Sequence, residues 1–208
     1  MKRILLFVMV LYVIFVNTAF ASISKISESG VSYQIEYPQL DSDDKNIADM
    51  INNDIKKYVN SFKVDYNNGK FYEGQMKFET KYEDDNYLSI IFNDSRTYQA
   101  HYRPQNKYIG LNYNKRTGEK IPLRYFVHIG TDDSYTIREC PLYNSANKKI
   151  DRYEFSKGSK LIRDNYFLYG GGTIALIYQV HERGCHADGM TYAVLDLKTI
   201  DYLNRKNP

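Results

Sequence analysis

The sequence predicts an α+β fold: antiparallel sheet with one long amphipathic helix packed on a face, arranged as two intimately associated halves. In residues 41–62, apolar side chains recur at three- and four-residue steps, which is the period of a helix with one buried face. Several other stretches alternate apolar and polar residues, as half-buried strands do. Clusters of Asn, Asp and Gly separate these stretches and indicate turns between neighbouring strands.

The N-terminal elements follow from these patterns in order. Residues 26–37 should form one opening strand, because apolar and polar side chains alternate there, and Pro38 should end it. The helix at residues 41–62 has cap candidates at positions 41–43, whose side-chain oxygens can accept hydrogen bonds from its first backbone amides. The Asn-Asn-Gly sequence at residues 67–69 then breaks the chain.

The remaining elements are mainly strands. They are expected at residues 75–82, 87–92, 94–102, 107–113, 167–168, 173–180 and 191–197. Three consecutive glycines at 170–172 should form a turn between two of them. A short helix or turn is expected at 121–129, and a helix at 135–140 that Pro141 should end. The basic tail at 204–208 should be frayed.

Residues 1–21 have the pattern of a cleavable signal peptide. Two basic residues precede an apolar run at residues 4–16, and Ala19 and Ala21 precede the expected cut before Ser22. The run of about 13 residues is shorter than the roughly 20 that a membrane-spanning helix needs. We therefore expect a secreted or periplasmic protein with no membrane span after cleavage, and retention of the leader as an N-terminal anchor is the alternative.

Charge gives little indication of a partner. The net charge is +3, of which Lys2 and Arg3 in the leader supply +2, so the mature chain is close to neutral. A near-neutral chain does not indicate a nucleic-acid partner. The 21 tyrosines and the lack of tryptophan suit a β-rich core and contact surfaces.

The chain has two cysteines, Cys140 and Cys185. In an oxidising compartment, an even number of cysteines indicates a disulfide. Closing a loop of about 45 residues would contribute on the order of 4 kcal/mol in the chain-entropy model. We therefore predict a Cys140–Cys185 bond, with two separate buried thiols as the alternative.

One loop near the C-terminus has the residue types of a zinc site. It contains His181, Cys185, His186 and Asp188. Their spacing matches no zinc-finger or metalloprotease pattern, and a disulfide-bonded cysteine cannot be a thiolate ligand. We expect a polar loop between two strands, in which Gly184 and Gly189 supply turn geometry, and no metal site.

No catalytic residue is predicted. The glycines at 170–172 lack the Gly-Lys-Ser/Thr ending of a phosphate loop. No serine lies in a nucleophile elbow, and paired acids such as Asp84 and Asp85 are expected as turn residues. We therefore expect neither a cofactor nor an enzyme, and a hydrolase of envelope polymers is the alternative.

Neighbouring predicted strands carry several tyrosines that alternation can place on one exposed face. These are Tyr98, Tyr102, Tyr108 and Tyr113. Tyrosine is enriched at binding surfaces, although ordinary packing between strands explains such a pattern as well.

From about residue 32 to residue 203, the order of short motifs resembles that of one family. The motifs are Tyr-Gln-Ile-Glu-Tyr-Pro at 33–38, Ile-Asn-Asn-Asp-Ile at 51–55, Ala-His at 100–101, Thr-Gly-Glu-Lys-Ile-Pro-Leu at 117–123 and Ala-Asp-Gly at 187–189. The order is similar to that in the extracellular domains of lysozyme-sensing anti-sigma factors of the RsiV type and in the N-terminal region of peptidoglycan deacetylases of the PdaC type. The resemblance implies an N-terminal half at residues 22–118 and a C-terminal half at 119–208, the latter of the lysozyme-sensing type.

We therefore expect an exported envelope module that binds a cell-wall glycan or an envelope protein, such as a lysozyme-like muramidase. Two segments hold the candidate binding residues: Tyr98, His101 and Tyr102 in one, and Gly184, His186, Asp188 and Gly189 in the other. An assembly role through an exposed sheet edge is a further alternative.

Overall fold

The structure is a computed structural model that describes residues 22–100, 102–150 and 164–208. The predicted leader and the candidate binding residue His101 therefore lie outside the described residues. The helices are α1 (Lys45–Asn67), α2 (Ser134–Glu139) and α3 (Leu197–Lys206), with short 3-10 turns η1 (Leu123–Tyr125), η2 (Thr131–Asp133) and η3 (His186–Asp188). The strands are β1 (Ser22–Ser29), β2 (Tyr33–Asp41), β3 (Glu73–Glu83), β4 (Tyr87–Thr97), β5 (Gln105–Asn114), β6 (Leu142–Asn144), β7 (Tyr166–Gly170), β8 (Thr173–Tyr178) and β9 (Thr191–Leu195).

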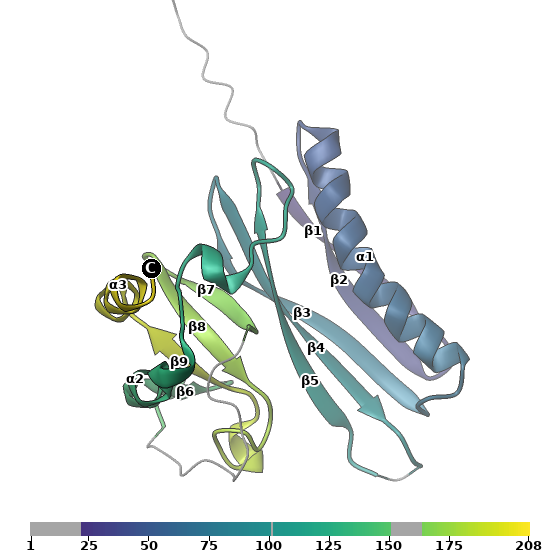
Figure 1. Ribbon diagram of the computed structural model, residues 1–208. Helices are drawn as coiled ribbons and strands as arrows, with labels where there is room; N and C mark the ends of the chain where they lie inside the picture. The colour runs from purple at the N-terminus through teal and green to yellow at the C-terminus, as the bar shows by residue number, and fades with distance from the viewer. Residues whose placement is uncertain (1–21, 101, 151–163) are drawn as a thin grey trace, which may run out of the picture.

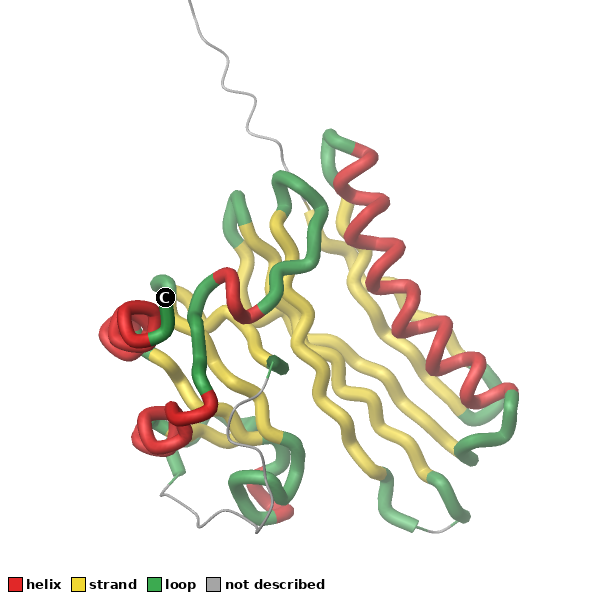
Figure 2. The backbone as a smooth tube through the Cα atoms, viewed as in Figure 1, coloured by secondary structure: helices red, strands yellow, loops and turns green. Residues whose placement is uncertain are grey.

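These elements form four layers (Figure 1). Helix α1 covers the outer face of sheet one, whose strand order is β1-β2-β3-β4-β5. Sheet two, with the order β6-β9-β8-β7, packs against the other side of sheet one, and α2 and α3 lie beyond it (Figure 2). Apart from the parallel pair β2–β3, which α1 connects, the strands pair antiparallel. The predicted α+β class with antiparallel sheets and one long helix packed on a sheet is confirmed.

The N-cap of α1, Asp44, lies one residue after the last predicted cap position. The carboxylate of Asp44 accepts hydrogen bonds from the backbone amides of Asn46 and Ile47 at 3.0 and 3.3 Å. The helix also continues beyond its predicted end, because Tyr66 still packs on the core. Gly69, with φ +70°, then turns the chain as the Asn-Asn-Gly sequence indicates.

Among the described residues, no helix combines the length and apolarity needed to cross a bilayer.

Two predicted strand boundaries in sheet one are wrong. The opening strand is a hairpin, in which β1 and β2 pair along their whole length around a turn at residues 30–32. Strand β2 continues through Pro38 because its pairing with β3 ends at Ile35, so the missing proline amide costs no bond on that side. The strand predicted at 87–92 and the first part of the strand predicted at 94–102 are one strand, β4, because Asn93 stays paired with both neighbouring strands. This strand ends at Thr97 and not at residue 102.

The C-terminal half keeps the predicted Gly turn and adds a helix. Gly170 at the end of β7 and the two glycines that follow it all have positive φ, which only glycine adopts readily. The tail predicted to fray is instead the end of α3. There the side chain of Asn204 accepts from the backbone amide of His128 at 2.7 Å and donates to the carbonyl of Phe126 at 3.0 Å.

The predicted disulfide is not formed. Cys140 is buried at the end of α2, where its thiol donates to the carbonyl oxygen of Thr136 at 3.4 Å. Cys185 is a free cysteine on the exposed β8–β9 loop. The prediction fails because one thiol is buried in the apolar cluster beneath α2 and the other lies on an exposed loop. Burial raises the pKa of the Cys140 thiol to about 11.

Three apolar clusters hold the layers together. The first lies between α1 and sheet one and is built on residues such as Ile55, Phe62 and Phe92. The second lies between the sheets and includes Ile91 and Phe167. The third lies between sheet two and the α2–α3 layer. Successive residues of β4 and β7 therefore point into different clusters, as the two-residue period of a strand requires.

The outer edge of β5 is where the two sheets are joined. The backbones approach so closely that a Cβ on Gly110 would lie 2.0 Å from the carbonyl oxygen of Tyr166. The side-chain amide of Gln179 bonds both backbone groups of Tyr108, at 2.8 Å each. The amide of Asn165 bonds the backbone N–H of Gly110 at 2.7 Å and the carbonyl of Tyr108 at 2.8 Å. These side chains provide hydrogen-bond partners for backbone N–H and C=O groups that would otherwise be unpaired at the edge of the sheet.

Farther along the same edge, backbone and side chains continue the covering. The carbonyl of Asn112 accepts from the amide of Ile121 at 2.7 Å. The side chain of Asn112 donates to the carbonyl of Tyr166 at 2.9 Å and accepts from the hydroxyl of Ser89 at 2.6 Å. No such partner, among the residues that the structure describes, covers the edge at residues 105–107. The open end of β5 borders the candidate site.

Candidate functional site

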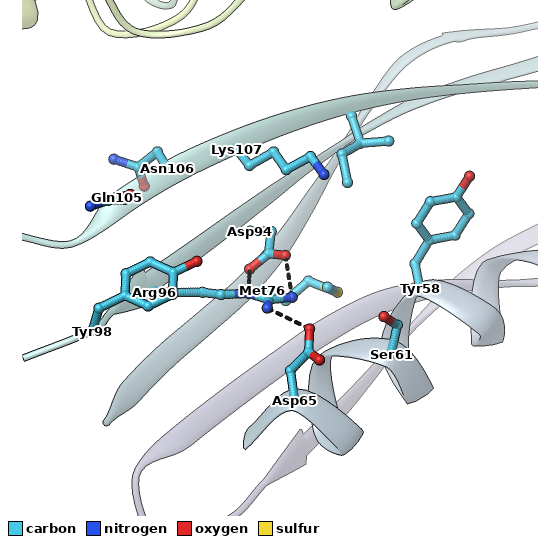
Figure 3. A pocket seen from close by; sticks show the side chains of 11 residues that line it. Tyr58, Ser61, Asp65, Met76, Asp94, Arg96, Tyr98, Gln105, Asn106 and Lys107 are labelled. Carbon is cyan, nitrogen blue, oxygen red and sulfur yellow. Dashed lines mark hydrogen bonds and ion pairs between the residues drawn. The ribbon is translucent and has the colours of Figure 1, made fainter. Parts of the chain in front are cut away.

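A hollow of about 450 Å³ lies between α1 and the outer strands of sheet one (Figure 3). Helix α1 contributes Tyr58, Ser61 and Asp65, and β5 contributes its open end. Volumes of this order are typical of small-molecule sites. We call it the first hollow.

The floor of the first hollow is formed by a change of character along β4. On the face toward α1, the alternate residues Leu88, Ile90 and Phe92 are fully buried apolar side chains. The next two positions on that face are Asp94 and Arg96. The apolar layer under α1 therefore ends in a charged pair, around which the hollow opens.

Arg96 holds this floor together. Its guanidinium donates to both carboxylate oxygens of Asp94 at 2.8 Å each and to Asp65 of α1 at 2.7 Å. It also stacks on Phe62 and Phe71, at 5.1 and 4.9 Å from the ring centroids. The paired planar geometry makes this a strong form of ion pair. It ties the helix to the sheet.

The charges of the network stabilise one another. Burial by itself would lower the pKa of Arg96, but the hydrogen bonds that it donates to Asp94 and Asp65 raise this pKa above its usual range. Hydrogen bonds from Lys70 and then Arg96 hold the pKa of Asp65 below its ordinary value. Arg96 and Asp65 are therefore both charged at neutral pH.

The walls carry polar side chains of a different kind. Ser61, Tyr98, Gln105, Asn106 and Lys107 line the hollow. Among the described residues, none of these side chains has a hydrogen-bond or ion-pair partner. The site therefore combines a fixed ionic floor with donors and acceptors that are available to a ligand.

A second hollow of about 550 Å³ adjoins the first across β5. Both are lined by Tyr58, Asn106, Lys107 and Ile109. The far wall of the second hollow contains Gln179 and Glu182 at the start of the β8–β9 loop. Two of its amide groups, those of Gln179 and Asn165, are occupied in covering the edge of β5.

The predicted binding residues of the β4–β5 loop lie in different places. Tyr98 lines the first hollow and is 48% exposed. Tyr102 is 69% exposed and is not among the residues that line the hollow. Tyr108 and Tyr113, which the same pattern included, are a wall of the second hollow and a fully buried core residue.

The second predicted segment forms the β8–β9 loop around η3. A Cβ on Gly184 would lie 2.8 Å from the side chain of Thr191. The carboxylate of Asp188 accepts from the backbone amide of Cys185 at 2.8 Å. Gly189 has φ +66°. These contacts give the loop its shape, and a binding role for its residues stays a prediction.

His186 pairs with His181 in the same loop. Nδ1 of His186 lies 3.3 Å from Nε2 of His181, and the rings stack with centroids 5.2 Å apart. Within the part of the chain that the structure describes, no group of three or more His, Cys, Asp or Glu residues is arranged to hold a metal ion. Figure 1 shows this loop and the β4–β5 loop at the same end of the molecule, but no hydrogen bond or ring contact joins His186 to Tyr98 or Tyr102 among the described residues.

Several residues of the site were not predicted from the sequence. The sequence contained a signal for Asp94 and Arg96, because they occupy the next two positions on the face of the strand whose earlier residues are apolar and buried. Asp65 gave no such signal, since its pairing with Arg96 spans 31 residues. Lys107 and Gln105 have the sequence pattern of ordinary exposed strand residues, and only the packing of α1 on the sheet makes them part of the hollow.

Comparisons with known proteins identify the fold. No protein-family model matches the chain, and no curated protein matches it. A DUF3298 family protein from Pseudomonas aeruginosa PAO1 has a similar crystal structure, with a TM-score of 0.55 and 7% identity over 88% of this chain and 93% of that one. A DUF3298 member from Bacteroides fragilis NCTC 9343 has a TM-score of 0.50 and 11% identity over 89% and 93% of the two chains.

These two similarities show a shared fold and nothing finer. DUF3298 is an uncharacterised domain family, so the comparison brings no activity with it. The resemblance to RsiV-type and PdaC-type domains stays a prediction. The part of this chain that the structure describes has the same fold as the two DUF3298 proteins.

Proposed function

We propose that this protein is an exported envelope module that binds a glycan of the cell wall in the first hollow. One observation carries the proposal: a concave site of ligand size is lined by five polar side chains that have no hydrogen-bond or ion-pair partner in the described part of the chain. Export rests on the signal-peptide pattern of residues 1–21.

A saccharide fits the chemistry of the walls. Hydroxyl and acetamido groups need both donors and acceptors, and the side-chain amides of Gln105 and Asn106 provide both. Tyr98 offers an apolar ring face with a polar tip at the edge of the same hollow. The fixed Asp65–Arg96–Asp94 floor keeps these walls in place before the ligand arrives, which reduces the cost of binding.

The same geometry gives little support to the alternative of hydrolysis. A glycosidase needs a general acid whose pKa is raised. In the first hollow, both carboxylates are bound to Arg96, and the pKa of Asp65 is lowered. Binding is the function that these residues support best.

Retention on purified cell-wall glycan tests the proposal. We expect the wild-type protein to co-sediment with peptidoglycan sacculi and the double variant Gln105→Ala/Asn106→Ala to lose most of this retention. Gln39→Ala is the matched control, because Gln39 is an exposed strand residue outside the hollow.

Two results would contradict the proposal. One is a wild-type protein that does not co-sediment. The other is a double variant that is retained as well as the Gln39→Ala control. A parallel column of immobilised lysozyme distinguishes the other partner class, since retention there and not on sacculi would indicate an envelope protein as the ligand.

A further inference from the structure

Lys107 lies at the boundary between the two hollows and lines both. It is directly opposite Asp94 in the β4–β5 ladder, and directly paired residues project from the same face of a sheet. Figure 3 shows its side chain extended along the first hollow beside the Asp94–Arg96 pair, with no interaction drawn to its ammonium group.

This ammonium group is uncompensated for a specific reason. Opposite charges that face each other across strands normally pair. Here the fork of Arg96 takes both oxygens of Asp94 at 2.8 Å each, and such bidentate pairing is stronger than a contact with one ammonium group. Asp65, the other acid of the hollow, is bound by Arg96 and Lys70. Lys107 has no hydrogen-bond or ion-pair partner among the described residues.

We infer that the ligand of this site is a saccharide that carries a carboxylate, and that Lys107 binds the carboxylate. The inference rests on the proposed function and specifies its substrate class. In this arrangement the carboxylate lies beside the ammonium group of Lys107, and neutral parts of the saccharide face Gln105 and Asn106.

Titration calorimetry with matched ligands tests this assignment. The acidic ligand is an oligosaccharide of alternating N-acetylglucosamine and N-acetylmuramic acid, the sugar that carries a lactyl carboxylate. The two neutral ligands are the same oligosaccharide with its carboxyl groups reduced to alcohols, and an N-acetylglucosamine oligomer of equal length. An oligogalacturonate tests whether the carboxylate of a uronic acid serves equally. We expect the acidic ligands to bind roughly three- to tenfold more tightly than the neutral ones, the range of a partly exposed charged contact.

Variants then assign the preference to one residue. Lys107→Met keeps most of the apolar stem and removes the charge, so it should abolish the preference while the affinity for neutral oligomers stays within about twofold. Lys77→Met is the control, because Lys77 is an exposed lysine of β3 outside both hollows. It should keep the full preference.

The possible failures are distinguishable. Equal binding of acidic and neutral oligomers, or a preference that survives in Lys107→Met, would overturn the inference and leave the glycan-binding proposal intact. No binding of any oligosaccharide would overturn both.

Discussion

The two ends of β5 have the same kind of backbone but different surroundings. From Tyr108 to Asn114, amide side chains and the segment at residues 119–121 cover its outer edge. At residues 105–107 no described residue covers the edge, and the side chains line the hollows. The covered end serves as a structural joint between the sheets. The open end carries the polar groups of the candidate site. Substitutions at the covered end should therefore affect stability, and substitutions at the open end should affect binding.

The largest effect is expected at the covered end. Gly110→Ala would place a Cβ 2.0 Å from the carbonyl oxygen of Tyr166, and backbone atoms cannot give way as a flexible side chain can. We expect a loss of about 3 kcal/mol in the free energy of unfolding, as for severe overpacking. Gly69→Ala is the control, since its site is open but has φ +70°, and it should cost only about 1 kcal/mol. Urea denaturation measures both, and similar losses would show that the strand backbones are not closely joined there.

A smaller loss is expected when the edge groups of β5 are uncovered. Gln179→Ala removes the two hydrogen bonds of 2.8 Å to the backbone of Tyr108. Each is worth about 1 kcal/mol net, so the variant should lose about 2 kcal/mol. Amide hydrogen exchange of Tyr108 should become faster in the variant, while that of Leu111, in the same strand, should change less. An unchanged rate at Tyr108 would mean that Gln179 does not protect the edge.

The ionic floor beneath the open end should give a pH-dependent contribution. The folded pKa of Asp65 lies below its ordinary value, which is close to 3.9 in an unfolded chain. Its stabilisation is therefore fully present above about pH 4 and is lost as the pH falls through the lower folded pKa. Asp65→Asn should destabilise the protein at pH 7, and its difference from wild type should shrink in strongly acidic solution. Asp43→Asn, at an exposed position before α1, is the control, and a difference that stays constant with pH would contradict the assignment.

The same contrast explains what could be predicted from the sequence. Local patterns were sufficient for α1, whose stripe of apolar residues is continuous, and for the glycine turn at 170–172. They failed at the turn of residues 30–32, where Gly30 is the sole strong turn signal. They also failed for the covered edge, because Asn165 and Gln179 act on residues 55 and 71 positions away. Such contacts depend on how one sheet packs on the other, and a local sequence pattern does not predict this packing.

The smallest effect on stability should come from the proposed binding residues themselves. Gln105 and Lys107 are exposed, and neither side chain has a partner among the described residues. Surface substitutions of this kind usually change the free energy of unfolding by less than about 0.5 kcal/mol. Gln105→Ala and Lys107→Met should therefore unfold at the wild-type urea concentration while weakening glycan retention. If either variant lost more than about 1 kcal/mol, the open end of β5 would be part of the structural joint, and the division of this strand into a covered and a ligand-facing end would be wrong.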